Sequence, residues 1–223
     1  MKNKSIITVM IISFIVFLSV TFWLTSDNGF MYDANIIDWT ERVSTDGLIA
    51  FMEALSVIGS SEVILLLTAV IAGVFLLKRN WFFLFYFLTV SVGGVVLNFA
   101  LKMLFQRARP GDEVSHIEVF NFSFDIPSYS YPSGHMMRAS ILFIFLLYIS
   151  YRFIKKTQIK WIAYIVSMAV LVGVGLSRLF LDAHFLSDIV GAISISIVWF
   201  CICHLFFKRY DERQTVYQFR GFR

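Results

Sequence analysis

The chain has 223 residues, of which 58% are hydrophobic and 15% charged, and its formal net charge is +4. A soluble domain does not need this much apolar surface, so the composition excludes an ordinary soluble enzyme and indicates a membrane protein. Its basic residues gather at the ends of apolar runs, which suits an anionic membrane leaflet and gives no indication of nucleic acid binding.

Six apolar runs are long enough to cross a hydrocarbon core of ~30 Å, which takes about 20 residues of helix. In chain order they cover residues 6–24, 63–77, 81–105, 139–153, 161–181 and 185–207. The first is interpreted as a membrane helix, because its apolar stretch exceeds that of a cleavable signal peptide and no small-residue cleavage site follows it. The second is short and is expected to extend back toward Leu55, past Ser60, Ser61 and Glu62. The sequence therefore predicts an all-α, polytopic membrane protein with six transmembrane helices.

Residues 28–55, between the first two runs, mix apolar and acidic side chains. The pattern favours an amphipathic helix that lies in the outer membrane interface, with Trp39 at headgroup depth. An irregular outer loop is the alternative interpretation.

Lys and Arg concentrate at alternate ends of the runs, at residues 2–4, 78–79, 152–160 and 208–223. Because cytoplasmic ends retain these side chains, both termini of this multi-pass protein of the cell membrane are expected in the cytoplasm. The connection of residues 106–131 then lies outside, and a connection of this length usually serves binding. With no internal repeat and no hydrophilic linker, residues 1–223 are interpreted as one membrane-embedded domain.

Three polar clusters are expected to meet on the outer side. Lys102 and Arg109 are seven residues apart, about two helical turns, so a continued third helix would place both on one face. An ionisable group within a span is costly and usually functional, so Lys102 indicates an anionic partner, with snorkelling to the interface as the alternative.

The second cluster is Ser133, Gly134 and His135, which follow Pro132 at the start of the fourth helix. Free backbone N–H groups at a helix start bind anions, and the histidine adds a proton donor that a plain helix cap does not require.

The third cluster contains Arg178, His184 and Asp188. The last two are four residues apart on one helix face, so the carboxylate can hold one ring nitrogen and leave the other as a nucleophile. Cations, backbone dipoles, a nucleophile and an acid are the set that phosphoryl transfer requires. The nearby carboxylates are too few for a two-metal clamp, so no metal ion or other cofactor is expected.

At these residues the chain resembles the type 2 phosphatidic acid phosphatase family, whose tripartite pattern is K-x6-R-P, P-S-G-H and S-R-x5-H-x3-D. The chain has KMLFQRARP at residues 102–110, PSGH at 132–135 and SRLFLDAHFLSD at 177–188, in the same order and spacing. The resemblance covers about residues 55–205 and implies the six-helix membrane form of the family's lipid phosphatases.

The resemblance also implies roles for single residues. His184 would be the nucleophile that becomes phosphohistidine, Asp188 would orient it, and His135 would protonate the leaving group. The phosphate oxygens would be held by Lys102, Arg109, Ser133, Gly134 and Arg178. Arg138 stands where small or hydroxylated residues are more usual, and it is either a helix-end charge or a contact for a second phosphate.

The leading hypothesis is a metal-independent lipid phosphatase at the outer face of the membrane. Undecaprenyl pyrophosphate, phosphatidylglycerol phosphate and phosphatidic acid are the candidate substrates, and the sequence favours none of them. A lipid phosphotransferase, in which another hydroxyl replaces water, is the second hypothesis. A non-catalytic anion or lipid transporter is the third, although the inverted repeats typical of transporters are missing from the sequence. The sequence indicates no oligomeric state.

Overall fold

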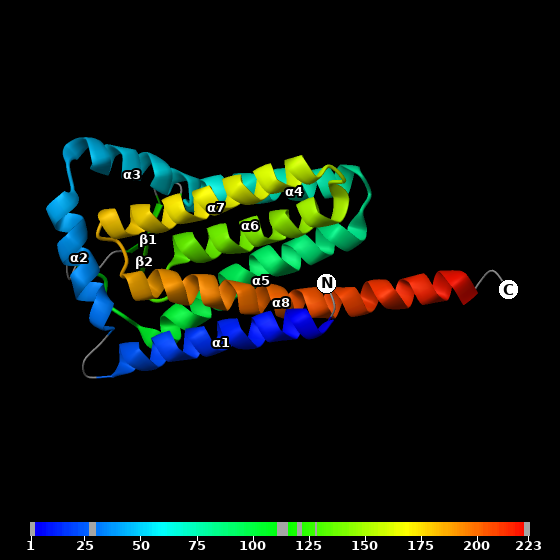
Figure 1. Ribbon diagram of the computed structural model, residues 1–223, viewed down its shortest axis with the longest axis horizontal. Helices are drawn as coiled ribbons and strands as arrows, with labels where there is room; N and C mark the ends of the chain where they lie inside the picture. The colour runs from blue at the N-terminus through cyan, green and yellow to red at the C-terminus, as the bar shows by residue number, and fades with distance from the viewer. Residues whose placement is uncertain (1–2, 27–29, 111–115, 120–121, 128, 221–223) are drawn as a thin grey trace.

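Long helices run side by side in the computed structural model, which describes residues 3–26, 30–110, 116–119, 122–127 and 129–220 (Figure 1). The long helices are α1 (Asn3–Thr25), α4 (Ser61–Leu77), α5 (Trp81–Phe105), α6 (Gly134–Phe153), α7 (Thr157–Phe180) and α8 (Leu186–Arg220). Two shorter helices, α2 (Met31–Val43) and α3 (Asp46–Ile58), precede α4. Among the described residues, six helical segments are long and apolar enough to cross a membrane, with α3 and α4 counted as one. The predicted all-α, multi-pass fold is confirmed.

Large apolar side chains cover the outside of the bundle. Leu77, Leu104 and Phe22 are 85%, 72% and 70% exposed. Soluble proteins rarely expose contiguous apolar surface of this kind, whereas hydrocarbon solvates it without cost. The centre is packed with aromatic rings, and the Phe87 and Phe145 side chains are fully buried there with ring centroids 4.8 Å apart.

The outer amphipathic segment forms two helices instead of the one predicted, and residues 28–29 at its start lie outside the described part of the chain. The break lies at Ser44 and Thr45, because Thr45 is extended and its hydroxyl accepts from the N–H of Leu48 at 3.3 Å, which caps α3. Helix α2 exposes Trp39 and buries Asp33. Helix α2 lies across one end of the bundle, whereas α3 runs beside α7 and leads into α4 (Figure 1).

The second predicted span extends back past Leu55 as expected, since Asp46–Leu77 counts as one candidate membrane span, but its helix is interrupted at Gly59 and Ser60. Helix α3 ends at Ile58, and α4 begins at Ser61 with the Ser60 hydroxyl accepting from the N–H of Val63 at 3.2 Å. Gly59 separates the two helices, and a Cβ there would lie 2.8 Å from Cγ1 of Val174. The Ser60 hydroxyl cap starts a new helix at this point, and the close approach of α7 explains why the residue before it is a glycine.

The connection after α5 contains a short antiparallel hairpin, β1 (His116–Val119) with β2 (Phe122–Pro127), which the sequence did not indicate. Residues 111–115, 120–121 and 128 of this connection lie outside the described chain.

The sixth predicted helix is longer than expected, since α8 continues beyond residue 207 to Arg220. Residues 208–220 are mostly polar or charged, so no apolar run marks that extension.

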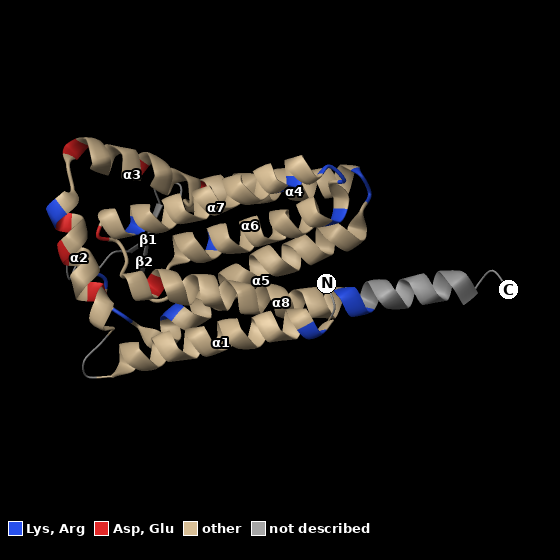
Figure 2. Cartoon of the chain, viewed as in Figure 1, with Lys and Arg blue, Asp and Glu red and all other residues tan. Residues whose placement is uncertain are grey.

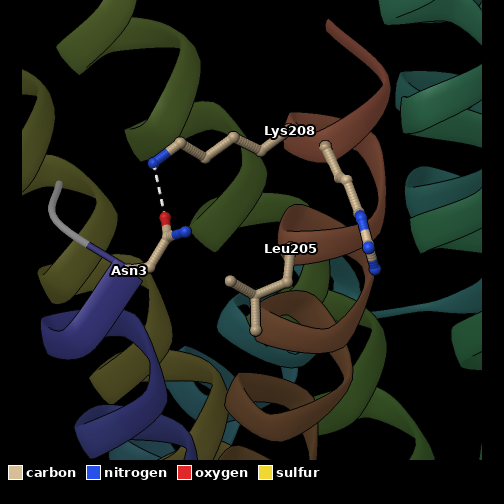
Figure 3. A pocket seen from close by; sticks show the side chains of 4 residues that line it. Asn3, Leu205 and Lys208 are labelled. Carbon is tan, nitrogen blue, oxygen red and sulfur yellow. Dashed lines mark hydrogen bonds between the residues drawn. The ribbon is translucent and has the colours of Figure 1, made fainter. Parts of the chain in front are cut away.

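The acidic residues gather at one end of the bundle, whereas basic residues lie at both ends (Figure 2). Asp and Glu lie on α2, α3 and the helix ends beside them, whereas Lys and Arg lie at both ends, around the turn between α4 and α5 and the connection from α6 to α7 as well as among the acidic residues. Away from the acidic end, the Nζ of Lys208 donates to the side-chain oxygen of Asn3 at 2.6 Å and ties α8 to the start of α1 (Figure 3). A pocket of about 350 Å³ lies there against Leu205 and Arg209, away from the clusters that the sequence analysis singled out.

Candidate active site

The three predicted clusters meet at the end of the bundle that α2 crosses (Figure 1). Lys102 lies in the last turn of α5, Ser133 precedes α6, and Arg178 lies in the last turn of α7. The backbone N–H of Ser133 donates to the backbone oxygen of Asp188 at 3.2 Å, which joins the start of α6 to the start of α8. The Nζ of Lys102 donates to the backbone oxygen of Tyr129. Hydrogen bonds therefore hold the ends of these helices around one site.

His184 and Asp188 form the hydrogen-bonded pair that their spacing predicts. Nδ1 of His184 lies 3.3 Å from Oδ2 of Asp188, and the side chains are 1% and 0% exposed. His184 does not lie inside a helix as predicted, since α8 begins at Leu186. Asp188 reaches back to accept from the N–H of Phe185 at 2.9 Å, which is one contact of a capping box. One carboxylate therefore fixes both the helix start and the imidazole.

The surroundings of His184 favour the neutral imidazole. Burial lowers the pKa of His184, while the hydrogen bond and the charge of Asp188 oppose that shift. When Nδ1 is the donor to Asp188, Nε2 carries the ring's lone pair. A neutral ring in this tautomer can act as a nucleophile at ordinary assay pH.

Ser130 is a member of this site that the sequence analysis missed. Its buried hydroxyl donates to Oδ2 of Asp188 and lies 3.2 Å from Nδ1 of His184. Its backbone N–H donates to the backbone oxygen of Arg107 at 2.8 Å. No spacing rule links Ser130 to a histidine on another segment, so only the fold brings the two together.

The start of α6 has the geometry of an anion site. The Ser133 hydroxyl accepts from the N–H of Met136 at 3.4 Å and is buried, so this serine caps the helix. A Cβ at Gly134 would lie 3.3 Å from both Arg138 Nη1 and Asn98 Oδ1. The missing side chain at Gly134 therefore lets two polar groups approach the positive end of the α6 dipole.

Lys102 and Arg109 do not share a helix face, which corrects the prediction from their spacing. Helix α5 ends at Phe105, and Gln106 adopts a left-handed conformation with φ 45°, so the chain leaves the helix before Arg109. Arg109 still belongs to the site. Burial lowers the pKa of Arg109, and the nearby carboxylate of Asp188 opposes that shift.

Arg138 and Arg178 each carry a buried donor that the described residues do not satisfy. Nη1 of Arg178 donates to the Ser56 hydroxyl at 2.6 Å, but Nε of Arg178 and Nε of Arg138 have no hydrogen-bond partner in the described chain. A buried donor without a partner costs about 1–3 kcal/mol. Both groups therefore favour the binding of an anion that would accept from them.

His135 lies in the first turn of α6, two residues after the Ser133 cap. It is half-buried, and a Cβ at Gly59 would lie 3.5 Å from the Cβ of His135. The close approach of the α3 to α4 connection therefore places His135 at the same end of the bundle as the other two clusters.

Two more charged residues contact the site without having been predicted. Arg107 lies two positions before the motif arginine and forms an ion pair with Asp188, with 2.6 Å between Nη1 and Oδ1. Asp33 of α2 pairs with the same guanidinium at 2.8 Å. The sequence showed Arg107 only as one of several outer cations and Asp33 only as one acid of an amphipathic segment.

Comparison with known proteins identifies the family and the fold. The family model of the PAP2 superfamily matches residues 63–212. The chain is similar to phosphatidylglycerophosphatase B of Bacillus subtilis (strain 168), with 29% identity over 164 residues, which are 73% of this chain and 74% of that protein. It also resembles a crystal structure described as the first transmembrane PAP2 type phosphatidylglycerolphosphate phosphatase from Bacillus subtilis, with a TM-score of 0.72 and 26% identity. That likeness covers 92% of this chain and 96% of the other.

Proposed function

The chain belongs to the PAP2 superfamily and is a membrane lipid phosphatase, and we propose that it hydrolyses phosphatidylglycerol phosphate through a phosphohistidine at His184. The buried hydrogen-bonded pair of His184 and Asp188 is the observation that carries the mechanism. The descriptions of the Bacillus subtilis protein and of the Bacillus subtilis crystal structure to which the chain is similar both support the substrate. These descriptions favour phosphatidylglycerol phosphate over undecaprenyl pyrophosphate and phosphatidic acid. The sequence alone favoured none of the three lipids.

In the proposed reaction, Nε2 of His184 attacks the terminal phosphorus, and the bond from phosphorus to the lipid oxygen breaks. His135 gives its proton to the departing alkoxide, which leaves as an alcohol. Water then attacks the phosphohistidine, His135 takes a proton from this water, and inorganic phosphate leaves. Asp188 keeps Nδ1 in place and stabilises the positive charge that the ring gains on attack.

The cations account for the remaining chemistry. Lys102, Arg109 and Arg178, with the N-terminus of α6, would neutralise the charge on the phosphoryl oxygens in the transition state. This charge is the reason that the proposed reaction needs no metal ion. The buried Nε of Arg138 would contact the second phosphate of the substrate, the phosphodiester of phosphatidylglycerol phosphate.

Purified protein in detergent is expected to release phosphate from phosphatidylglycerol phosphate faster than from phosphatidic acid or undecaprenyl pyrophosphate, and EDTA is expected to leave the rate unchanged. The measurement is kcat/KM for the three lipids with and without chelator, and the His184→Ala protein is the blank.

Each part of the proposal has its own contrary result in this assay. Loss of activity in EDTA that added Mg²⁺ restores would refute metal independence. A higher kcat/KM for another lipid would refute the substrate. Transfer of phosphate to an added alcohol in preference to water would identify a phosphotransferase.

We further propose that the site lies at the outer face of the cell membrane, with both termini in the cytoplasm. A cysteine at Ser123 in β2 is expected to react with an impermeant thiol reagent on intact cells, whereas one at Thr157, at the start of α7, is expected to react only after permeabilisation. The parent is the control, because Cys201 and Cys203 are both buried. The reverse labelling pattern would place the site inside and refute an outer-leaflet substrate.

A further inference from the structure

Arg107 joins two buried carboxylates that come from distant parts of the chain. Its Nη1 donates to Oδ1 of Asp188 at 2.6 Å, and its Nη2 donates to Oδ2 of Asp33 at 2.8 Å. The Asp33 and Asp188 side chains are only 7% and 0% exposed. The planar fork of a guanidinium suits such a bridge, and the Phe185 ring packs against it, 3.9 Å from Cζ to the ring centroid.

Asp33 also holds the start of α8. Its Oδ1 accepts from the backbone N–H of Ser187 at 3.0 Å, and its Oδ2 accepts from the Ser187 hydroxyl at 2.5 Å. The first N–H groups of a helix need acceptors from outside it, so Asp33 caps α8 from α2. Asp188 is the next residue along α8. One side chain on α2 therefore fixes both the backbone that carries Asp188 and the cation that contacts it.

We propose that Asp33 is a positioning residue of the reaction: it holds Arg107 and the start of α8 so that Asp188 keeps its hydrogen bond to His184. This inference rests on the proposed function of that pair. Asp33 lies before residues 63–212, which the family model matches, so the role belongs to the amphipathic segment and not to the motif-bearing helices.

The charge balance explains why an acid is needed at position 33. Two carboxylates, those of Asp33 and Asp188, share the single positive charge of Arg107. A neutral amide at position 33 would leave that charge to act on Asp188 alone, and Asp188 would then stabilise the His184 ring less as the ring becomes positive. The loss is expected in kcat with little change in KM, since Asp33 contacts Arg107 and Ser187 and not the residues assigned to phosphate binding.

Asp33→Asn is expected to lower kcat roughly tenfold, within the usual range for coupled groups of one hydrogen-bond network, and to change KM less than about twofold. Asp38→Asn is the matched control. It makes the same chemical change on the same helix, but the Asp38 side chain is 62% exposed and its ion pair, 3.8 Å long, is with Arg42. Its kcat is expected to stay within about twofold of the parent.

A double-mutant cycle separates positioning from general stabilisation. In an Asp188→Asn background, measured under single-turnover conditions, Asp33→Asn is expected to cost no more than about twofold, because its effect passes through Asp188. Equal losses in both backgrounds would overturn the proposal, as would an unchanged kcat for Asp33→Asn alone.

A second variant covers the case in which Asp33→Asn does not fold. Arg107→Lys replaces the guanidinium fork by a point charge that cannot bridge both carboxylates. Like Asp33→Asn, it is expected to lower kcat roughly tenfold with little change in KM, and to cost no more than about twofold in the Asp188→Asn background. If neither variant gives a folded protein, the contacts are structural and the proposal is overturned. Absence of phosphate release by the parent would refute the proposed function instead, so the two failures are distinguishable.

Discussion

His184→Ala is expected to reduce phosphate release to less than a few per cent of the parent, because no other group can replace the nucleophile of a covalent mechanism. The protein is expected to fold. Without the imidazole, the Asp188 carboxylate still accepts from Ser130, from the N–H of Phe185 and from Arg107. The measurement is kcat/KM for the best lipid substrate, together with the covalent phosphate that radiolabelled substrate leaves on the protein after a rapid quench.

His204→Gln is the matched control for this substitution. His204 lies on α8, which begins after His184, and its Nδ1 lies 3.0 Å from the hydroxyl of Tyr86 among aromatic rings. Its replacement is expected to affect stability and to leave labelling intact. Activity of His184→Ala above a few per cent of the parent, or retained labelling in that variant, would exclude the phosphohistidine at this position.

Local patterns were enough to predict the membrane helices. The third predicted span, residues 81–105, agrees with α5 at both ends, because Asn80 caps its start and the apolar run stops where the helix stops. The predictions were incomplete where a helix is interrupted. The second span extends back past Leu55 as expected, but α3 ends at Ile58 and α4 begins at Ser61, where the side chain of Val174 on α7 leaves little room for a Cβ at Gly59.

The site shows the same division between local and distant information. The pair of His184 and Asp188 is read from a spacing of four, and the structure contains it. Ser130 donates directly to the Asp188 carboxylate, and Asp33 is linked to it through Arg107. Neither residue has a sequence spacing to Asp188 that would indicate the contact. The expected shared face of Lys102 and Arg109 was wrong because a non-glycine residue, Gln106, adopts a left-handed conformation and ends α5.

The role of His135 can be tested by its dependence on the leaving group. A general acid matters most when the departing oxygen is a poor leaving group, in the Brønsted sense. The alkoxide that leaves phosphatidylglycerol phosphate or phosphatidic acid is poor, whereas the lipid phosphate that leaves undecaprenyl pyrophosphate is already stable as an anion. The imidazole can be removed without loss of the α6 cap, which depends on the Ser133 hydroxyl.

His135→Ala is therefore expected to lower kcat/KM for a lipid phosphomonoester by roughly tenfold or more beyond its effect on a lipid pyrophosphate, given the ~10²–10⁴-fold range of general acid catalysis. The measurement is kcat/KM for both substrates in the variant and the parent. His184→Ala provides the comparison, because both substrates need the nucleophile and both rates should fall alike. Equal losses on the two substrates in His135→Ala would mean that this histidine binds phosphate in the ground state and the transition state alike, and the proton donor would then have to be another group.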